Sequence, residues 1–202
     1  MDKLEKKINE IKAKALTNHV PIVRDVTAKV LYDLVMAENP MRILEIGTAV
    51  GYSALLMKSA SNTSSIVTIE KDIDRYNEAK DNIANAGVDN IICIHGDAYE
   101  VLQGYVENGE KFDFVFLDGP KGYYYRYLQL IKPMLNNGGI IFADNVGFFG
   151  MVESGIYPHR HKTIVVSLQN YLKEVSQLPF QSEIHLDVDD GYAISRYKGE
   201  VK

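Results

Sequence analysis

Short apolar runs alternate with longer amphipathic stretches from Arg42 onward, and this alternation restricts the fold more than any other feature of the sequence. It is typical of parallel strands joined by crossover helices, because a parallel connection needs a dozen or more residues. We expect strands near 42–47, 65–70, 91–95, 112–118 and 138–143, with helices between them near 51–61, 72–86, 98–107 and 122–135. The central part of the chain is therefore predicted to form an α/β sheet.

The segments on either side complete the prediction. The second N-terminal helix is expected to start after Pro21, where a missing N–H costs nothing. The last two strand-like segments are separated by Asp189 and Asp190, which indicates an antiparallel hairpin. The predicted fold class is α/β, doubly wound, with a mostly parallel seven-stranded sheet and an antiparallel C-terminal hairpin. The additional elements are helices near 2–16, 22–38 and 161–177 and strands near 181–188 and 191–198.

Composition limits the size and the class of the protein. A chain of 202 residues with 46% hydrophobic and 24% charged residues suits one globular domain, predicted over 1–202. The 22 basic and 27 acidic residues give a net charge of −5, which argues against a general nucleic-acid binder. One cysteine, Cys93, excludes an intrachain disulfide. Because no run of eighteen apolar residues exists, we expect a cytoplasmic protein with no membrane partner.

The first binding signal is a glycine-marked turn between a buried strand and a helix. Gly47 and Gly51 allow a ligand to approach the backbone, and the helix that follows offers free N–H groups. The spacing lacks the middle glycine of the dinucleotide fingerprint. Glu70 ends the second strand, where a carboxylate can accept hydrogen bonds from ribose hydroxyls. Together these residues predict an adenosine-containing ligand, whereas a plain turn and a solvated strand end are the alternative.

Asp97 and Ala98 follow the third strand and reach the same predicted edge of the sheet. Ligands of open α/β folds bind at the carboxyl ends of the strands, so Asp97 is a candidate adenine contact. An aspartate at this place can also cap the next helix. Because Gly47 and Glu70 are predicted to line the same edge, the adenine contact is the favoured interpretation.

The second binding signal consists of oxygen-bearing side chains after the fourth and fifth strands. Asp118, Asp144 and Asn145 provide two carboxylates and one amide, a hard-oxygen set that suits Mg²⁺ or another divalent cation. Lys121 stands three residues after Asp118. A lysine beside a divalent cation loses its proton more easily, so Lys121 is a candidate general base. The alternative is a turn at Asp144 with an ordinary surface lysine.

These motifs together resemble the magnesium-dependent O-methyltransferases of the catechol and caffeoyl-CoA type, which have the class I, Rossmann-like methyltransferase fold. The resemblance extends from about residue 20 to 197. Its first glycine motif is shared by many S-adenosylmethionine (SAM) methyltransferases, whereas the aspartate, lysine and aspartate–asparagine set is specific to this family. The resemblance implies a SAM-dependent O-methyltransferase with a bound divalent cation.

The resemblance also implies roles for individual residues. Glu45, Gly47 and Ser53 would hold the methionine part of SAM, and Glu70 would hold its ribose. Ile22 would cover the cofactor, and the N-terminal helices in 1–38 would cover the cofactor and substrate site. The other implied roles are Asp97 and Ala98 beside adenine, Asp118 facing both cofactor and metal, Asp118, Asp144 and Asn145 as metal ligands, and Lys121 with Asp118 as catalytic residues.

Within the family, the sequence is most similar to the bacterial tRNA 5-hydroxyuridine methyltransferases, which make 5-methoxyuridine at the wobble position. The supporting segments are Val20–Ile22, Gly47–Ala49, Asp118–Gly122 and Arg160–Val165. The implied partner is the anticodon loop of tRNA. A 5-hydroxyl next to the O4 carbonyl offers the same pair of oxygens as a catechol, so a small catechol-like substrate is the alternative.

The distribution of charge along the chain bears on the choice between tRNA and a small substrate, and it does not depend on the resemblance. Acidic residues are absent between Gly119 and Ala143 and between Ser154 and Lys173, and both stretches flank the proposed metal site. Phosphates could approach there despite the net charge. Four tyrosines provide aromatic faces for an unstacked base, although a helix that buries two of them is equally expected. They are Tyr123, Tyr124, Tyr125 and Tyr127.

Two other classes of function are considered. An NAD-dependent reductase is disfavoured because the middle glycine of the dinucleotide fingerprint is missing. A binding module without catalysis is disfavoured by Lys121. Relatives within the resembled family are commonly dimers, so we expect a homodimer, with the N-terminal helices as its candidate contact.

Overall fold

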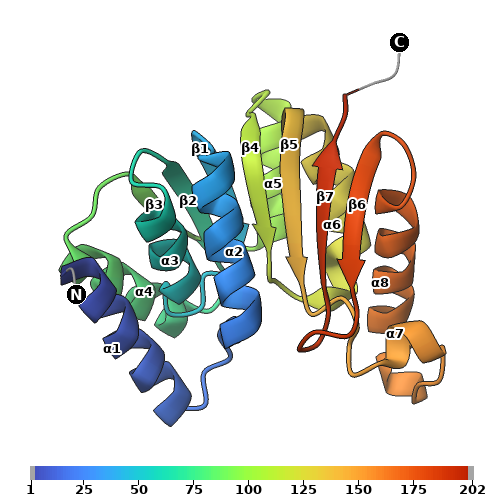
Figure 1. The fold of residues 1–202 in the computed structure, drawn as a ribbon, viewed down its shortest axis with the longest axis horizontal. Helices are drawn as coiled ribbons and strands as arrows, with labels where there is room; N and C mark the ends of the chain where they lie inside the picture. Colours follow the sequence, from blue (N-terminus) through green and yellow to red (C-terminus); the bar gives the residue numbers. More distant parts are fainter. Residues whose placement is uncertain (1–2, 200–202) are drawn as a thin grey trace. The chain divides into compact units, whose positions relative to one another are not determined.

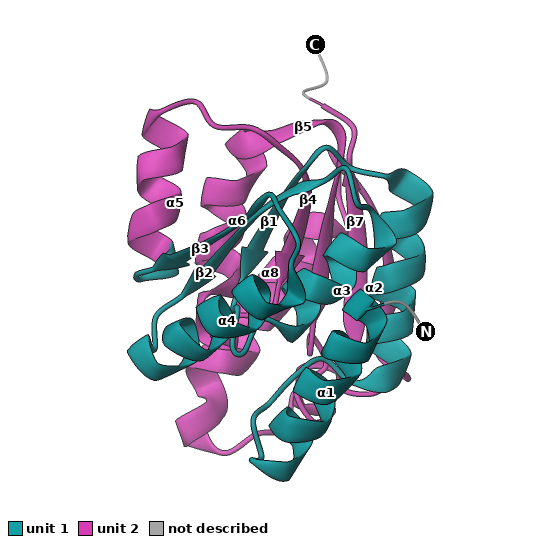
Figure 2. Ribbon diagram, turned by 90° about the vertical axis from the view of Figure 1, so that its left-hand side faces the viewer, with its two compact units in different colours: residues 1–98 teal, residues 99–202 magenta. Residues whose placement is uncertain are grey.

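The computed structural model describes residues 3–199 and divides into two compact units, Met1–Ala98 and Tyr99–Lys202, which Figure 2 colours separately. Each unit is described by itself. The predicted single domain over 1–202 and its N-terminal helical region 1–38 include residues 1–2 and 200–202, which lie outside the described part. The single-domain organisation stays a prediction.

The first unit contains three parallel strands in the order β3-β2-β1, and its helices connect them (Figure 1). The strand β1 and the middle of β2 are buried apolar runs. The helices α1 and α2 pack against α3, and α1 also contacts α4. The elements are α1 (Lys3–Thr17), α2 (Asp25–Glu38), β1 (Arg42–Ile46), α3 (Tyr52–Ala60), β2 (Ser65–Glu70), α4 (Ile73–Ala86) and β3 (Ile91–His95).

Local signals set the helix ends in this unit. The Asp72 carboxylate accepts hydrogen bonds from two backbone N–H groups and caps α4, which ends at Gly87 with φ 68°. The predicted helix 22–38 begins three residues later than expected, at Asp25. The reason is that the segment before it is extended and buries Val20 and Val23. This tertiary contact overrides the helical start that Pro21 indicates.

The second unit contains four strands in the order β4-β5-β7-β6. The β4–β5 pair is parallel, whereas β7 pairs antiparallel with both β5 and β6 (Figure 1, red). The helices α6 and α8 pack against each other. The elements are α5 (Ala98–Glu107), β4 (Phe112–Leu117), η1 (Lys121–Tyr123), α6 (Tyr124–Ile131), η2 (Lys132–Met134), β5 (Leu135–Asp144), α7 (Met151–Ser154), η3 (His159–His161), α8 (Lys162–Val175), β6 (Phe180–His185) and β7 (Tyr192–Tyr197).

Two predicted boundaries in this unit are wrong. The single helix predicted over 122–135 is an eight-residue α-helix between two short 3₁₀ helices, because Pro133 cannot donate the backbone hydrogen bond that a continuing α-helix needs. The strand β5 begins at Leu135, which pairs with Phe112 before the register shifts. A Cβ at Gly139 would lie 2.8 Å from the Asn136 carbonyl oxygen, so glycine is required at this irregular pairing.

The fold class is confirmed. The strands are mostly parallel, the helices connect them, and the two C-terminal strands form the expected antiparallel pairs. Within residues 3–199, no helix is long and apolar enough to cross a membrane.

Candidate active site

The glycine-marked turn of the first unit has an unusual backbone. Gly47, Ala49 and Gly51 have φ values of 103°, 45° and 83°, a conformation that glycine adopts without steric cost. The Gly47 N–H donates to the Ile69 carbonyl at 3.0 Å, which fixes the turn to the end of β2. A Cβ at Gly51 would lie 3.5 Å from the Ala79 carbonyl oxygen of α4. The turn therefore keeps close to its neighbours, and the N–H groups of Gly47, Ala49 and Gly51 are bonded within the protein.

Glu45 lies in β1 directly beneath this turn and is completely buried. Its carboxylate accepts hydrogen bonds from the Ser53 hydroxyl and the Thr68 hydroxyl, both at 2.5 Å. The Thr68 hydroxyl also contacts that of Thr48 at 2.5 Å. A buried carboxylate needs such donors, so Glu45 joins β1, β2 and the start of α3. Sequence reasoning missed Thr68, which a lone hydroxyl within an apolar strand could have indicated.

Glu70 ends β2 and points toward the glycine turn. One carboxylate oxygen accepts the Ala49 N–H at 2.8 Å, and the other accepts the Asp72 N–H at 2.9 Å. Each carboxylate oxygen has two acceptor sites, so both can still receive a hydroxyl hydrogen bond. These two backbone contacts orient the Glu70 carboxylate, and its ribose role stays a prediction.

The other predicted cofactor residues of this unit lie in separate elements. Asp97 forms an ion pair with Lys71 at 2.8 Å, just before buried Ala98 begins α5. Ile22 lies half-buried in the extended segment between α1 and α2. The roles of these residues in binding stay predictions.

The predicted metal residues lie together in the second unit. Leu117 pairs with Ala143 across the parallel β4–β5 ladder, so the following residues, Asp118 and Asp144, stand level at the two strand ends. The Lys121 ammonium lies 2.7 Å from an Asp118 carboxylate oxygen, and both side chains are one-fifth exposed. Asp144 is 2% exposed, and its carboxylate accepts the Asn145 N–H at 2.7 Å.

The two carboxylates affect each other electrostatically. Burial, followed by the negative charge of Asp118, raises the pKa of Asp144 to about 7. The Asn145 N–H and the Lys121 ammonium act in the opposite direction, and Asp189 adds to the increase. Near neutral pH an added positive charge would therefore be bound favourably between Asp118 and Asp144.

Tyr124 fixes the spacing of these strand ends. Its buried hydroxyl lies 2.9 Å from the Leu117 carbonyl and 2.9 Å from the Asp144 carbonyl, and it donates its proton to one of them at a time. Burial raises the pKa of Tyr124 well above its usual value, so the hydroxyl keeps its proton. The Lys121 ammonium lies 5.8 Å from the centre of the Tyr124 ring. Sequence reasoning treated Tyr124 as an aromatic face and missed this role.

The segment after Asp144 is held by the loop between β6 and β7. Asn145 has a φ of 56°, and the next two residues donate backbone hydrogen bonds to Gly191 and Asp190 at 3.0 and 2.8 Å. A Cβ at Gly191 would lie 2.9 Å from the Gly147 nitrogen, so only glycine fits there. The hairpin loop therefore positions the third predicted metal ligand.

The predicted ligand set differs from a site built only of acids, histidines and cysteines. In the described part of the chain, no group of three or more such residues is placed to hold a metal ion. The predicted set contains two carboxylates and an amide, so it lies outside that kind of group. Both the binding of a cation and its identity stay predictions.

The four tyrosines that follow Lys121 differ in burial. Tyr124 and Tyr127 are buried, which confirms the alternative that the helix buries two of them, and they offer no face to a base. Tyr123 is exposed, and Tyr125 is half-buried.

The fold and the unit 1 geometry define a class of proteins. A glycine turn after the first parallel strand and a carboxylate at the end of the second are typical of proteins that bind a nucleoside cofactor at the carboxyl edge of the sheet. The carboxylate–lysine–carboxylate–amide group of unit 2 adds a candidate reaction site.

Comparison with known proteins narrows this class. A family model described as O-methyltransferase matches residues 2–198. The chain is 30% identical over 168 residues to a candidate caffeoyl-CoA O-methyltransferase of Arabidopsis thaliana, covering 81% of this chain and 72% of the relative. It is 36% identical over 121 residues to a catechol O-methyltransferase of Niastella koreensis, covering 58% and 53%.

The fold is also found in solved structures. An O-methyltransferase from Bacillus cereus in complex with S-adenosylhomocysteine (SAH) superposes with a TM-score of 0.85 at 24% identity, covering 96% of this chain and 91% of that one. The chain belongs to the O-methyltransferase family. The enzyme class expected from the sequence is therefore confirmed.

Proposed function

We propose that this enzyme transfers a methyl group from SAM to the 5-hydroxyl of 5-hydroxyuridine at the wobble position of tRNA, with the help of Mg²⁺ or another divalent cation. The observation that carries the proposal is the pairing of Asp118 with Asp144 at adjacent strand ends, with the pKa of Asp144 raised to about 7. Two carboxylates brought together in this way favour a bound cation.

The residues of unit 1 fit SAM, which supplies a methyl group on a positively charged sulfur. Gly47 and Gly51 present backbone without a Cβ, and Glu70 has free acceptor sites for ribose hydroxyls. Glu45 and Ser53 would support the methionine end through their hydrogen bond. The remaining contacts that we propose are Ile22 as a cover and Asp97 and Ala98 beside adenine. The SAH-bound structure of the Bacillus cereus protein supports this choice of cofactor.

The residues of unit 2 fit a hard divalent cation, which would act as a Lewis acid toward two neighbouring substrate oxygens. Asp118, Asp144 and the Asn145 side chain would hold it. Lys121 lies 2.7 Å from Asp118. Beside a bound cation it would lose its own proton more easily, and its neutral amine would then accept the proton of the reacting hydroxyl. Tyr124 keeps the two strand ends at their spacing.

The acid-free stretches support an RNA substrate. Lys121 and Arg126 lie in the first stretch, and Arg160 and Lys162 lie in the second. They surround the metal residues along the chain, so phosphate groups meet little negative charge there.

The decisive experiment measures methyl transfer from labelled SAM to undermodified bulk tRNA, with Mg²⁺ and with a chelator. We expect transfer only with the cation, and mass spectrometry should identify 5-methoxyuridine as the product. Asp144→Ala should abolish turnover while calorimetry still detects SAM binding. Equal loss of turnover and SAM binding would contradict the assignment of Asp144, and transfer that survives chelation would contradict the cation.

A small catechol-like phenol is the second candidate substrate, because the Niastella koreensis relative is a catechol O-methyltransferase. A catechol presents the same pair of adjacent oxygens as 5-hydroxyuridine. Turnover on micromolar catechols with none on tRNA would favour this candidate. Calorimetry that detects binding of NAD and not of SAM would instead support the reductase alternative.

A further inference from the structure

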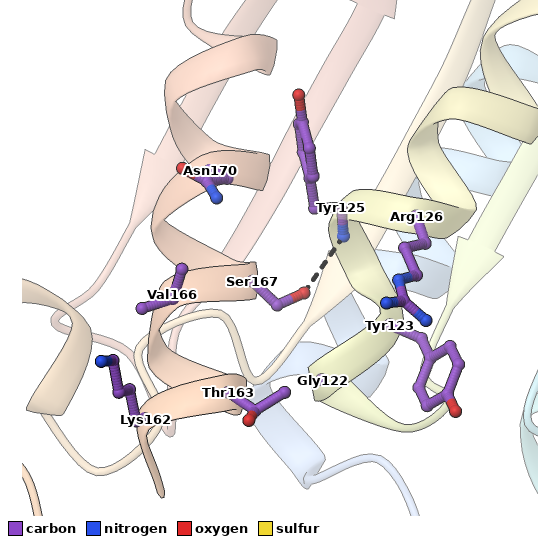
Figure 3. A pocket seen from close by; sticks show the side chains of 9 residues that line it. All are labelled: Gly122, Tyr123, Tyr125, Arg126, Lys162, Thr163, Val166, Ser167 and Asn170. Carbon is purple, nitrogen blue, oxygen red and sulfur yellow. Dashed lines mark hydrogen bonds between the residues drawn. The ribbon is translucent and has the colours of Figure 1, made fainter. Parts of the chain in front are cut away.

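A cleft of about 480 Å³ lies in the second unit between the η1–α6 segment and α8 (Figure 3). This volume is within the range of sites that hold small organic ligands. Gly122, the residue after Lys121, lines it, so the cleft adjoins the proposed reaction site along the chain. Its lining includes Tyr125 and Arg126 from α6 and Lys162, Thr163, Ser167 and Asn170 from α8.

The charge of this cleft is positive. Arg126 and Lys162 line it from opposite helices, and none of its described lining residues is acidic. Lys121 and Lys132 are engaged with Asp118 and Glu174. The Arg126 guanidinium lies 5.6 Å from the centre of the Tyr123 ring, which also lines the cleft (Figure 3). The cleft therefore favours an anionic occupant.

The polar and aromatic groups of the cleft indicate further features of its occupant. Figure 3 shows the Tyr125 ring standing between α6 and α8, with Thr163 pointing from α8 toward α6. The Ser167 hydroxyl already accepts the Tyr125 N–H at 3.3 Å, which ties the two helices together. The Asn170 amide carries both a donor and an acceptor. An occupant with a planar ring, hydrogen-bonding edges and an attached anionic group matches these features.

We propose that this cleft binds a nucleotide of single-stranded RNA that neighbours the methylated one. This inference rests on the proposed function. Arg126 and Lys162 contact its phosphates, Tyr125 stacks on its base, and Asn170 contacts the edge of the base. The cleft thereby supplies RNA affinity that the net charge of −5 does not predict.

The test measures binding of a fluorescent anticodon stem-loop RNA over a series of salt concentrations. Arg126→Gln and Lys162→Gln should each weaken binding several-fold and reduce the salt slope by roughly one. Tyr125→Leu should weaken binding roughly fivefold or more, with little change in the salt slope. Lys173→Gln is the matched control, because Lys173 is an exposed lysine of the same helix that does not line the cleft.

All four variants should keep wild-type SAM affinity and unfolding temperature, which excludes global damage. If wild-type enzyme methylates the RNA but the cleft variants bind it as Lys173→Gln does, the cleft assignment is overturned and the proposed function stands. If wild-type enzyme neither binds nor methylates RNA and acts on catechols, the proposed function fails and this inference fails with it.

Discussion

At the scale of single residues, the Tyr124 hydroxyl contacts the backbone at both strand ends that lead into Asp118 and Asn145. A carboxylate or amide after a predicted strand end identifies Glu70, Asp118, Asp144 and Asn145 from the sequence, because parallel strands end at one edge. Tyr124 could not be found in this way. Its hydroxyl contacts two backbone carbonyls, 7 and 20 residues away, and such contacts leave no pattern in the sequence.

Tyr124→Phe removes one hydroxyl, and we expect it to lower both the stability of the protein and its affinity for Mg²⁺. One buried carbonyl loses its hydrogen bond, which costs about 1–3 kcal/mol of the free energy of unfolding. Because the strand ends then separate, turnover should need more Mg²⁺, and added Mg²⁺ should partly restore it. The measurements are thermal unfolding and the Mg²⁺ dependence of methyl transfer.

Tyr171→Phe is the control for this change. Tyr171 is equally buried, its ring lies edge-on 5.8 Å from that of Tyr124, and its hydroxyl makes no hydrogen bond of normal geometry within residues 3–199. Removal of the Tyr171 hydroxyl should leave the Mg²⁺ dependence of methyl transfer unchanged. The same shift in both variants would show that the contacts of the Tyr124 hydroxyl with the Leu117 and Asp144 carbonyls do not set the Mg²⁺ dependence.

Asp144→Asn should stabilise the cation-free protein at alkaline pH. The pKa of Asp144 is about 7 in the folded protein and near 3.8 when unfolded, so the folded state binds the extra proton between these values. Wild-type stability should therefore fall as the pH rises from about 4 to 7, by a few kcal/mol in all. The variant lacks this decrease.

Denaturant unfolding at pH 4 and pH 8 without divalent cations checks this prediction. The two proteins should differ little at pH 4, and the variant should be the more stable at pH 8. Added Mg²⁺ should stabilise the wild type alone. Equal stability at pH 8 would mean that Asp144 causes no strain in the folded protein.

At the scale of elements, apolar runs located β1, β2 and β4, because burial on both faces leaves a clear signal. The errors occurred where tertiary contacts decide. Burial of Val23 delays the start of α2, and an irregular pairing brings Leu135 into β5. The backbone hydrogen bonds between the β6–β7 loop and the segment after Asn145 could not be predicted either, because they join residues more than forty positions apart.

Gly191→Ala tests whether the β6–β7 loop positions the segment after Asn145. The change forces an alanine to φ 79°, which costs about 1–2 kcal/mol, and it places a Cβ 2.9 Å from the Gly147 nitrogen. The segment after Asn145 must then move, so we expect a larger loss of stability and a fall in turnover. Urea unfolding and methyl transfer at saturating substrate measure both effects.

Gly138→Ala separates backbone strain from the clash. Gly138 has a similar φ of 83°, and a Cβ there would meet nothing within 4 Å. This variant should lose about 1–2 kcal/mol of stability and keep its turnover. Equal turnover in the two variants would show that the hairpin loop does not position Asn145.

At the scale of the whole molecule, the net charge of −5 describes only the average. Two acid-free stretches flank the proposed metal residues, where a negatively charged partner would meet the least repulsion. Exposed apolar side chains give a second molecular property. The N-terminal helices expose Leu16, Val26 and Met36 to more than half of their full extent.

A homodimer through these helices predicts a solution mass near that of two 22.7 kDa chains. Replacing Val26 and Met36 together by glutamate should produce monomers, because burying unpaired charges opposes association. Leu178→Glu is the control, since Leu178 is 76% exposed and lies outside these helices. Light scattering after size exclusion measures the mass, and a monomeric wild type would refute the prediction.

The strand order of the second unit has a consequence for synthesis of the protein. β7 is made after β6 but lies between β5 and β6, and the loop before it holds the residues that follow Asn145. A nascent chain that has reached only β6 therefore has β5 without its neighbour and the Asn145 segment without its support. On the ribosome, the proposed cation site of unit 2 should become competent only after residues 192–197 have emerged and inserted.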